Sequence, residues 1–183
     1  MKEYFVKYRP FLQFLGVFLL SYLVQIGIYQ LYLSQYDTAK FEVDDITVFV
    51  AEQSELVLDT FGYNVTLTPH TNDPSVKVLI DSKTIVRIVE GCNAISVMIL
   101  FVAFVLAFSK GWIKTLGFIV SGILIIHVLN ILRIALLTIG IMKYPDYTHI
   151  LHGVIFPFII YGVVFLLWIF WVTKITYNVK KSR

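Results

Sequence analysis

The chain contains four long apolar stretches, separated by polar segments of very unequal length. The stretches cover about residues 11–33, 92–109, 113–132 and 152–172, and the third extends to Ile141 if its last apolar turns are counted. A bilayer core needs roughly 20 apolar helical residues, with a range of about 17–25. We therefore predict four membrane-spanning helices, of which the second is at the short end of this range.

The first stretch is longer than a signal-peptide core and is not followed by a small-residue cleavage pattern. We therefore expect it to be a retained membrane helix that follows a short N-terminal tail.

A different pattern fills the long polar segment between the first two stretches. Residues 43–62 read "VDDITVFVAEQSELVLDTFG", an amphipathic helix with acidic residues at its start and Gly62 as its stop. The stretches "YNVTLT", "VKVLI" and "TIVRIVE" then alternate or are β-branched, with "TPHTNDP" and "DSK" as turns between them. The sequence predicts a helix followed by a β-meander.

The predicted fold class is therefore a mainly α membrane protein with about four transmembrane helices and a small extracytoplasmic α+β insertion. We divide the chain into 1–36 (N-terminal tail and first helix), 37–90 (the insertion) and 91–183. The last part is a three-helix transmembrane core with a basic C-terminal tail.

The composition indicates that most of the chain lies within a lipid bilayer. Of 183 residues, 58% are hydrophobic, and the mean hydropathy is +0.79, whereas a soluble domain is about 45–50% apolar. The net charge of +3 is weak support for nucleic-acid binding, because basic residues that flank membrane helices account for it. We expect membrane lipid, and no nucleic acid, as a partner.

Lysine and arginine set the predicted orientation, because they accumulate in cytoplasmic loops. They occur in the N-terminal tail, in the loop after the second stretch and in the C-terminal tail: Lys2, Lys7, Arg9, Lys110, Lys114, Lys174, Lys180, Lys181 and Arg183. These segments share one side of a four-span chain, which predicts cytoplasmic N- and C-termini. The opposite segment 34–91 holds ten acidic and four basic residues, as expected for a translocated segment.

This topology brings three uncommon side chains to one depth. Cys92, the single cysteine, lies at the outer start of the second span, and His152 lies at the outer start of the fourth. Arg133 follows Ile113 by 20 residues, roughly 30 Å of helix rise, which puts it near the outer boundary of the third span. His149 precedes His152 by one turn.

These side chains have a shared chemistry. A helix N-terminus and a nearby cation favour the nucleophilic thiolate of a cysteine, so we expect Cys92 to begin a helix close to Arg133. His152 at a helix start would stay neutral, as a general base requires. Glu90, two residues before the thiol, opposes the thiolate unless Arg87 or Arg133 neutralises it.

Each residue also has a structural interpretation. Cys92 can be a packing residue, Arg133 can extend to the headgroups, and histidines that flank a membrane helix are commonly interfacial. Asn130 lies one turn before Arg133 and forms, with His127, a predicted polar seam inside the helix bundle. With one cysteine no intramolecular disulfide forms, and the chain shows neither zinc-ligand spacing nor a Gly-rich phosphate loop. We predict no metal and no cofactor.

Three segments carry a resemblance to a known family. At "VEGCNAISVMILFVAFVLAF", "NILRIALL" and "HGVIFPFIIYGVVFLLWIFW" the chain resembles the exosortase/archaeosortase family, and it is most similar to the short exosortase F type of bacteria with an outer membrane. The motifs come in the family order of Cys, Asn-x-x-Arg and His. Two features differ: many members have about eight spans, and their cysteine is often followed by Ser-Gly, where this chain has Asn93 and Ala94.

The resemblance implies a membrane-embedded cysteine endopeptidase or transpeptidase in the bacterial inner membrane, with its site facing the periplasm. Its partners would be exported proteins with a C-terminal sorting signal, made of a short motif, a membrane helix and a basic tail. On matching positions, the nucleophile would be Cys92, the essential arginine Arg133 and the third member His152. His149 is the alternative histidine, and Asn130 and Glu90 would support the site or the substrate.

Two non-enzymatic readings compete with this one. The chain would be a membrane scaffold or assembly factor of an envelope export complex, or, less favoured, a small-solute transporter that uses the Arg133, Asn130 and His127 seam. Only the enzyme requires Cys92. We further hypothesise that segment 37–90 shields the site or receives the substrate.

Overall fold

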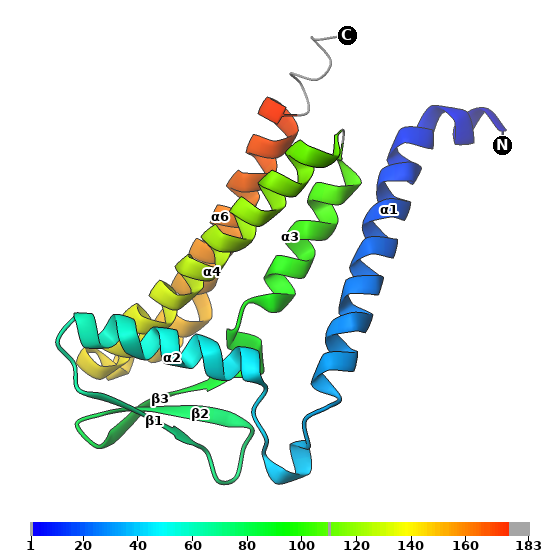
Figure 1. The fold of residues 1–183 in the computed structure, drawn as a ribbon. Helices are drawn as coiled ribbons and strands as arrows, with labels where there is room; N and C mark the ends of the chain where they lie inside the picture. Colours follow the sequence, from blue (N-terminus) through cyan, green and yellow to red (C-terminus); the bar gives the residue numbers. More distant parts are fainter. Residues whose placement is uncertain (1, 110, 176–183) are drawn as a thin grey trace. The chain divides into compact units, whose positions relative to one another are not determined.

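A computed structural model of the protein describes residues 2–109 and 111–175 (Figure 1). Helices dominate, and one small sheet comes between the first and second apolar helices in the order of the sequence. The main elements are α1 (Lys2–Leu33), α2 (Asp45–Thr60), β1 (Val65–Pro69), β2 (Ser75–Ile80), β3 (Lys83–Val89), α3 (Ile95–Ala107), α4 (Trp112–Lys143), α5 (Thr148–Ile150) and α6 (Phe156–Phe170). Short turns join them: η1 (Thr38–Lys40), η2 (Glu90–Cys92), η3 (Pro145–Tyr147), η4 (Leu151–Ile155) and η5 (Trp171–Ile175).

Three helical segments among the described residues are long and apolar enough to cross a membrane: Lys7–Leu33, Trp112–Lys143 and Pro145–Thr173. The remaining apolar helix, α3, has 13 residues, or roughly 20 Å of rise, which is short for a bilayer core. A multi-pass, mainly helical membrane protein is confirmed, and a total of four spanning helices stays a prediction. The predicted basic C-terminal tail after Ile175 lies outside the described residues.

The predicted insertion is present as a helix and a meander. Asp44 caps α2, because its carboxylate accepts a hydrogen bond from the backbone N–H of Thr47 (3.0 Å). Gly62 ends the helix with φ +84°, a left-handed conformation that glycine adopts without a steric cost. The interpretation of 43–62 as a helix and of the three β-branched stretches as strands is confirmed.

The sheet is antiparallel with the order β1-β2-β3, so β1 and β3 are edge strands. The register between β2 and β3 shifts between Val78 and Leu79, which pair with Val86 and Thr84. Ile85 is therefore an extra residue in β3, a β-bulge. Bulges change the direction of neighbouring side chains and are frequent beside active sites.

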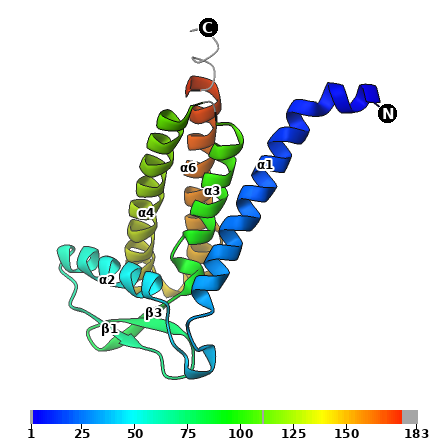
Figure 2. The ribbon, with the colours of Figure 1, turned by 45° about the vertical axis from the view of Figure 1, so that its right-hand side comes forward.

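Backbone contacts divide the chain into two compact units, one of which comprises residues 33–95 and 125–162. In this unit α2 lies across one face of the sheet (Figures 1 and 2). Apolar residues of α2, of all three strands and of α4 form one core: Val50, Ala51, Leu58, Val65, Val76, Val78, Ile80, Ile88, Ile134 and Ala135. This core fixes the sheet against the second half of α4 and includes Cys92 at its margin.

The other unit comprises the described parts of 1–32, 96–124 and 163–183. Aromatic rings connect its helices: Phe104 stacks on Trp168 with centroids 4.4 Å apart, and Phe118 stacks on Trp171 at 4.7 Å. Gly122 allows the ring of buried Phe101 to contact α4 closely. All candidate site residues belong to the first unit. The linear division at residues 36 and 90 stays a prediction.

Candidate active site

Cys92 is the last residue of η2, the turn that follows edge strand β3. Its side chain is half-buried and packs against the core of the unit. The expectation that Cys92 begins a helix is wrong, because α3 begins at Ile95. The cause is local: Ala94 has φ +63°, which a helix does not contain, and the Asn93 side chain accepts a hydrogen bond from the Ile95 N–H (2.9 Å) just before α3.

The loop that carries the thiol is anchored from two sides. Asn93 is buried, and its amide donates to the hydroxyl of Thr47 on α2 (3.2 Å). Asn130, on α4, has no exposed surface and donates its amide to the backbone carbonyl of Cys92 (2.7 Å). Buried polar groups hold their partners firmly, because an unpaired group costs about 1–3 kcal/mol. The backbone at Cys92 therefore has a fixed position.

Asn130 also connects the cysteine to the arginine. Arg133, one turn along α4, donates through Nη1 to the side-chain oxygen of Asn130 over a long 3.4 Å. The Arg133 Nε is buried and has no hydrogen-bond partner among the described residues. A half-buried guanidinium with a free buried donor does not fit an arginine that extends to lipid headgroups. The arrangement fits an arginine whose Nε–H is placed to donate to a bound group.

His152 lies in the turn η4, a single turn of π-helix between α5 and α6. The expectation that it begins a helix is wrong, since the helical segment begins earlier, at Pro145. The π-turn has a physical reason in Pro157, which has no N–H to donate to the preceding turn. Such π-turns are frequent at functional sites.

One cavity of about 340 Å³ is lined by Cys92, Arg133 and His152 together. Thr84, Arg87 and Thr148 add polar groups, and the rest of the wall is apolar, from β3 and α4: Ile85, Val86, Ile88, Ile134, Leu137 and Ile141. The three residues come from three different elements, η2, α4 and η4, and all lie in the unit of residues 33–95 and 125–162. Asn130 supports the cavity from its buried position. His149 and His152 are both exposed, and neither His149 nor Glu90 is among the lining residues.

The sequence model of the transmembrane exosortase family matches residues 10–174. The chain belongs to the transmembrane exosortase family. No curated protein and no solved structure gives a significant match to it. Family membership indicates a membrane-embedded role in the sorting or processing of proteins, and exosortases are generally cysteine proteases or transpeptidases. The short exosortase F type stays a prediction that is consistent with the length of the chain.

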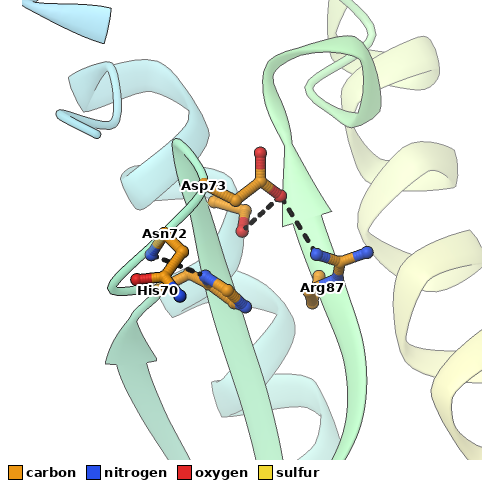
Figure 3. A network of polar contacts seen from close by, with 5 residues as sticks. His70, Asn72, Asp73 and Arg87 are labelled. Atoms are coloured by element: carbon orange, nitrogen blue, oxygen red, sulfur yellow. Dashed lines mark hydrogen bonds and ion pairs between the residues drawn. The ribbon is translucent and has the colours of Figure 1, made fainter. Parts of the chain in front are cut away.

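Sequence reasoning did not place the apolar wall or the polar residues Thr84, Arg87 and Thr148 in this exosortase's cavity. Thr148 has its hydroxyl bound to the carbonyl of Pro145 (2.6 Å), and Arg87 forms an ion pair with Asp73 (3.1 Å) (Figure 3). Arg87 entered the sequence argument only as a neighbour of Glu90. The alternation of β3 indicates which of its residues share a face, but no sequence signal shows that α4 and α5 lie beside that strand.

The predicted polar seam divides into two separate contacts in this exosortase. His127 shares a 2.7 Å hydrogen bond with Gln53 of α2, and its ring stacks on Phe49. Asn130 instead binds the Cys92 backbone. Both residues therefore attach α4 to the insertion. In the parts of the chain that the structure describes, no group of three His, Cys, Asp or Glu side chains is arranged to hold a metal ion.

Proposed function

We propose that this exosortase is a cysteine endopeptidase or transpeptidase that removes the C-terminal sorting signal of exported proteins. Cys92 is the nucleophile, Arg133 the electrostatic stabiliser and His152 the proton carrier. The observation that supports this proposal is the shared cavity: a thiol, a guanidinium with a free buried donor and an imidazole line one space of about 340 Å³. That volume holds several amino-acid side chains, whereas a merely structural cysteine would be packed without space around it.

The chemistry divides into two acyl transfers. The Cys92 thiolate attacks the carbonyl carbon of the scissile peptide bond, and a C–S bond forms. The C–N bond then breaks, and His152 delivers a proton to the leaving amine, which releases the C-terminal helix of the substrate. Water or an amine attacks the remaining thioester and restores the thiol.

Arg133 has its function in the transition state. The negative charge that develops on the carbonyl oxygen needs a donor that is already in place. The Arg133 Nε and the guanidinium around it are such a donor, since Asn130 binds Nη1 and leaves Nε without a partner. Between the two histidines, the cavity favours His152, because both are exposed but His152 alone of the two lines the cavity.

The partners follow from the membrane setting. An exported protein that is still held by its C-terminal helix would present the outer flank of that helix at Cys92, and its basic tail would stay in the cytoplasm. This placement uses the predicted topology, with both termini cytoplasmic and the site facing the periplasm of the inner membrane. Glu90 supports the loop before the thiol.

The test is cleavage of an exported protein with a C-terminal sorting signal, co-expressed with the full chain in a host that lacks exosortases. The enzyme proposal expects loss of the C-terminal helix with the native chain and none with C92A, at equal amounts of protein in the membrane. S96A, four residues later, is the matched control and should cleave normally. Equal cleavage by C92A and the native chain would exclude Cys92 as nucleophile, and no cleavage with either chain would favour the scaffold reading.

A further inference from the structure

A second cavity adjoins the one that holds Cys92. It has a volume of about 410 Å³ and shares Thr84, Ile85 and Ile141 with the first. Its other lining residues lie at the end of β2 and the turn after it, at the start of β3, at the end of α4 and in η3: Ile80, Asp81, Lys83, Met142 and Pro145. Because three residues line both spaces, the two cavities adjoin along β3 and α4, and together they are called the groove below.

The groove runs along the edge of the sheet. The first cavity touches five successive residues of β3, from Thr84 to Ile88. Successive side chains of a strand point to opposite faces, so a space against one face would touch alternate residues only. Contact with every residue means that the groove follows the free edge of β3, where the Ile85 bulge also turns the strand. Figure 3 shows β3 with β2 on one side and helical turns beyond its other side.

We infer that the upstream segment of the substrate binds in this groove as an extended strand that pairs with β3. This inference rests on the proposed function and names the recognition surface of the same site. Within the described residues β3 has one strand neighbour, β2. Its outward N–H and C=O groups are therefore available to the main chain of a peptide, which is the mode of recognition by β-strand addition.

Direction and length follow from the geometry. β3 runs from Lys83 toward Cys92, and a substrate with its scissile bond at the thiol also runs toward Cys92, so the pairing is parallel. On the helix side the groove extends from Arg133 to Ile141, two turns of α4 or roughly 12 Å of rise. An extended chain covers about 3.3 Å per residue, so the groove holds about three or four residues before the scissile bond.

The walls select apolar side chains. Ile85, Ile134, Leu137 and Ile141 line the first cavity, next to the thiol, where Arg87 is already paired with Asp73. The charged residues Asp81 and Lys83 line only the second cavity. Charged substrate residues in the first cavity would lose their hydration without a free partner, apart from the acceptor that Arg133 needs at the reacting carbonyl. We expect β-branched and other apolar residues at the positions that face α4.

The test uses a peptide electrophile on the full chain in detergent or nanodiscs. The probe is acetyl-tetravalyl chloromethyl ketone: the Cys92 thiolate attacks its CH2 carbon, a C–S bond forms, and chloride leaves. Because Cys92 is the one cysteine of the chain, intact mass reports the reaction. The alkylation rate should rise with peptide length and level off at about four residues. Methylation of the alternate peptide nitrogens that face β3 removes their hydrogen bonds and should lower the alkylation rate about tenfold. Methylation of the nitrogens that point away from β3 should have little effect on this rate.

Matched variants test the protein side. Thr84 on β3 and Thr66 on β1 are both exposed and both pair with Leu79 of β2, one on each side. T84W should fill the groove and remove the length dependence, whereas T66W, at the other edge, should leave it unchanged. Iodoacetamide, which needs no groove, should react with Cys92 at the same rate in both variants.

The outcomes separate this inference from the proposed function. If sorting-signal cleavage depends on Cys92 but peptide length, N-methylation and T84W have no effect on alkylation, the edge-strand inference is wrong and the protease stands. If the probes show length and N-methyl dependence while C92A cleaves normally, the groove binds peptides and the protease proposal is wrong.

Discussion

The side-chain amide of Asn130 donates a 2.7 Å hydrogen bond to the backbone carbonyl of Cys92. One residue on a helix thus fixes the position of a loop that is 38 residues away in the sequence. Its other atom, Oδ1, accepts from Arg133. The same side chain positions the nucleophile and the cation, so Asn130 is a positioning residue that contacts no substrate.

Asn130→Ala should therefore lower both stability and activity. The Cys92 carbonyl would lose a buried donor, which costs about 1–3 kcal/mol, and the thiol would lose its fixed distance to Arg133. We expect a lower unfolding temperature in detergent and slower cleavage. Asn72→Ala, an amide in an exposed turn of the sheet, should change neither. Normal cleavage by N130A would contradict the positioning role.

Arg133→Lys should lose most of the activity although the charge is kept. Lysine carries one ammonium group and lacks the planar guanidinium, whose Nε–H and Nη–H donors point in fixed directions. It therefore cannot bind Asn130 and donate from the Nε position at the same time. Loss of one preorganised donor at an oxyanion costs about 10²–10³ in rate. The control is Arg87→Lys, at the other arginine of the cavity, whose partner is Asp73 (Figure 3). Equal rates for R133K and R87K would argue against an oxyanion role.

The two histidines offer a matched pair. Both are exposed, but His152 lines the cavity and His149, one turn earlier, lies outside the lining. His152→Ala should reduce cleavage by about 10²–10⁴, the usual contribution of a general acid–base residue. His149→Ala should leave the rate near that of the native chain. A larger loss in H149A than in H152A would reverse the assignment.

Glu55 on α2 predicts a pH dependence of stability. Burial, together with the carboxylates of Asp59 and Glu52, raises the pKa of Glu55 above its ordinary value. The folded chain therefore binds this proton more strongly than the unfolded chain. Its contribution to stability is complete below the unfolded pKa and is lost as the pH rises through the raised, folded pKa.

Glu55→Gln should remove this dependence. The variant should unfold at a higher temperature than the native chain at pH 7, and the difference should disappear near pH 4. Asp146→Asn, which removes a carboxylate outside α2, should show no such convergence. A stabilising effect of E55Q that is equal at both pH values would contradict the titration of Glu55.

The sequence predicted the insertion well because its signals are local. The acidic residues at the start of the helix, Gly62 as a stop and the turns between the β-branched runs each act within a few residues, and the structure has α2 and the three strands where they indicate. The order Cys92, Arg133 and His152 in three separate apolar stretches also predicted which side chains line one cavity.

The wrong helix starts at Cys92 and His152 have their cause in unusual backbone conformations, and the groove was missed because it depends on tertiary packing. The left-handed Ala94 delays the start of α3, and hydropathy alone does not register a backbone angle at a residue other than glycine. The π-turn at His152 and the bulge at Ile85 are likewise changes of hydrogen-bond register, which leave the apolar pattern almost intact. The groove along β3 depends on tertiary packing against α4 and has no pattern of its own.

The central claim is that Cys92 carries the upstream part of the substrate as a thioester. The most direct measurement is the mass of the Cys92-containing peptide after the full chain meets a co-expressed sorting-signal protein and the reaction is stopped with acid. The account predicts an added mass equal to the upstream fragment, removed by neutral hydroxylamine and absent in C92A. Cleavage without any hydroxylamine-sensitive mass on Cys92, in the native chain and in H152A alike, would contradict it.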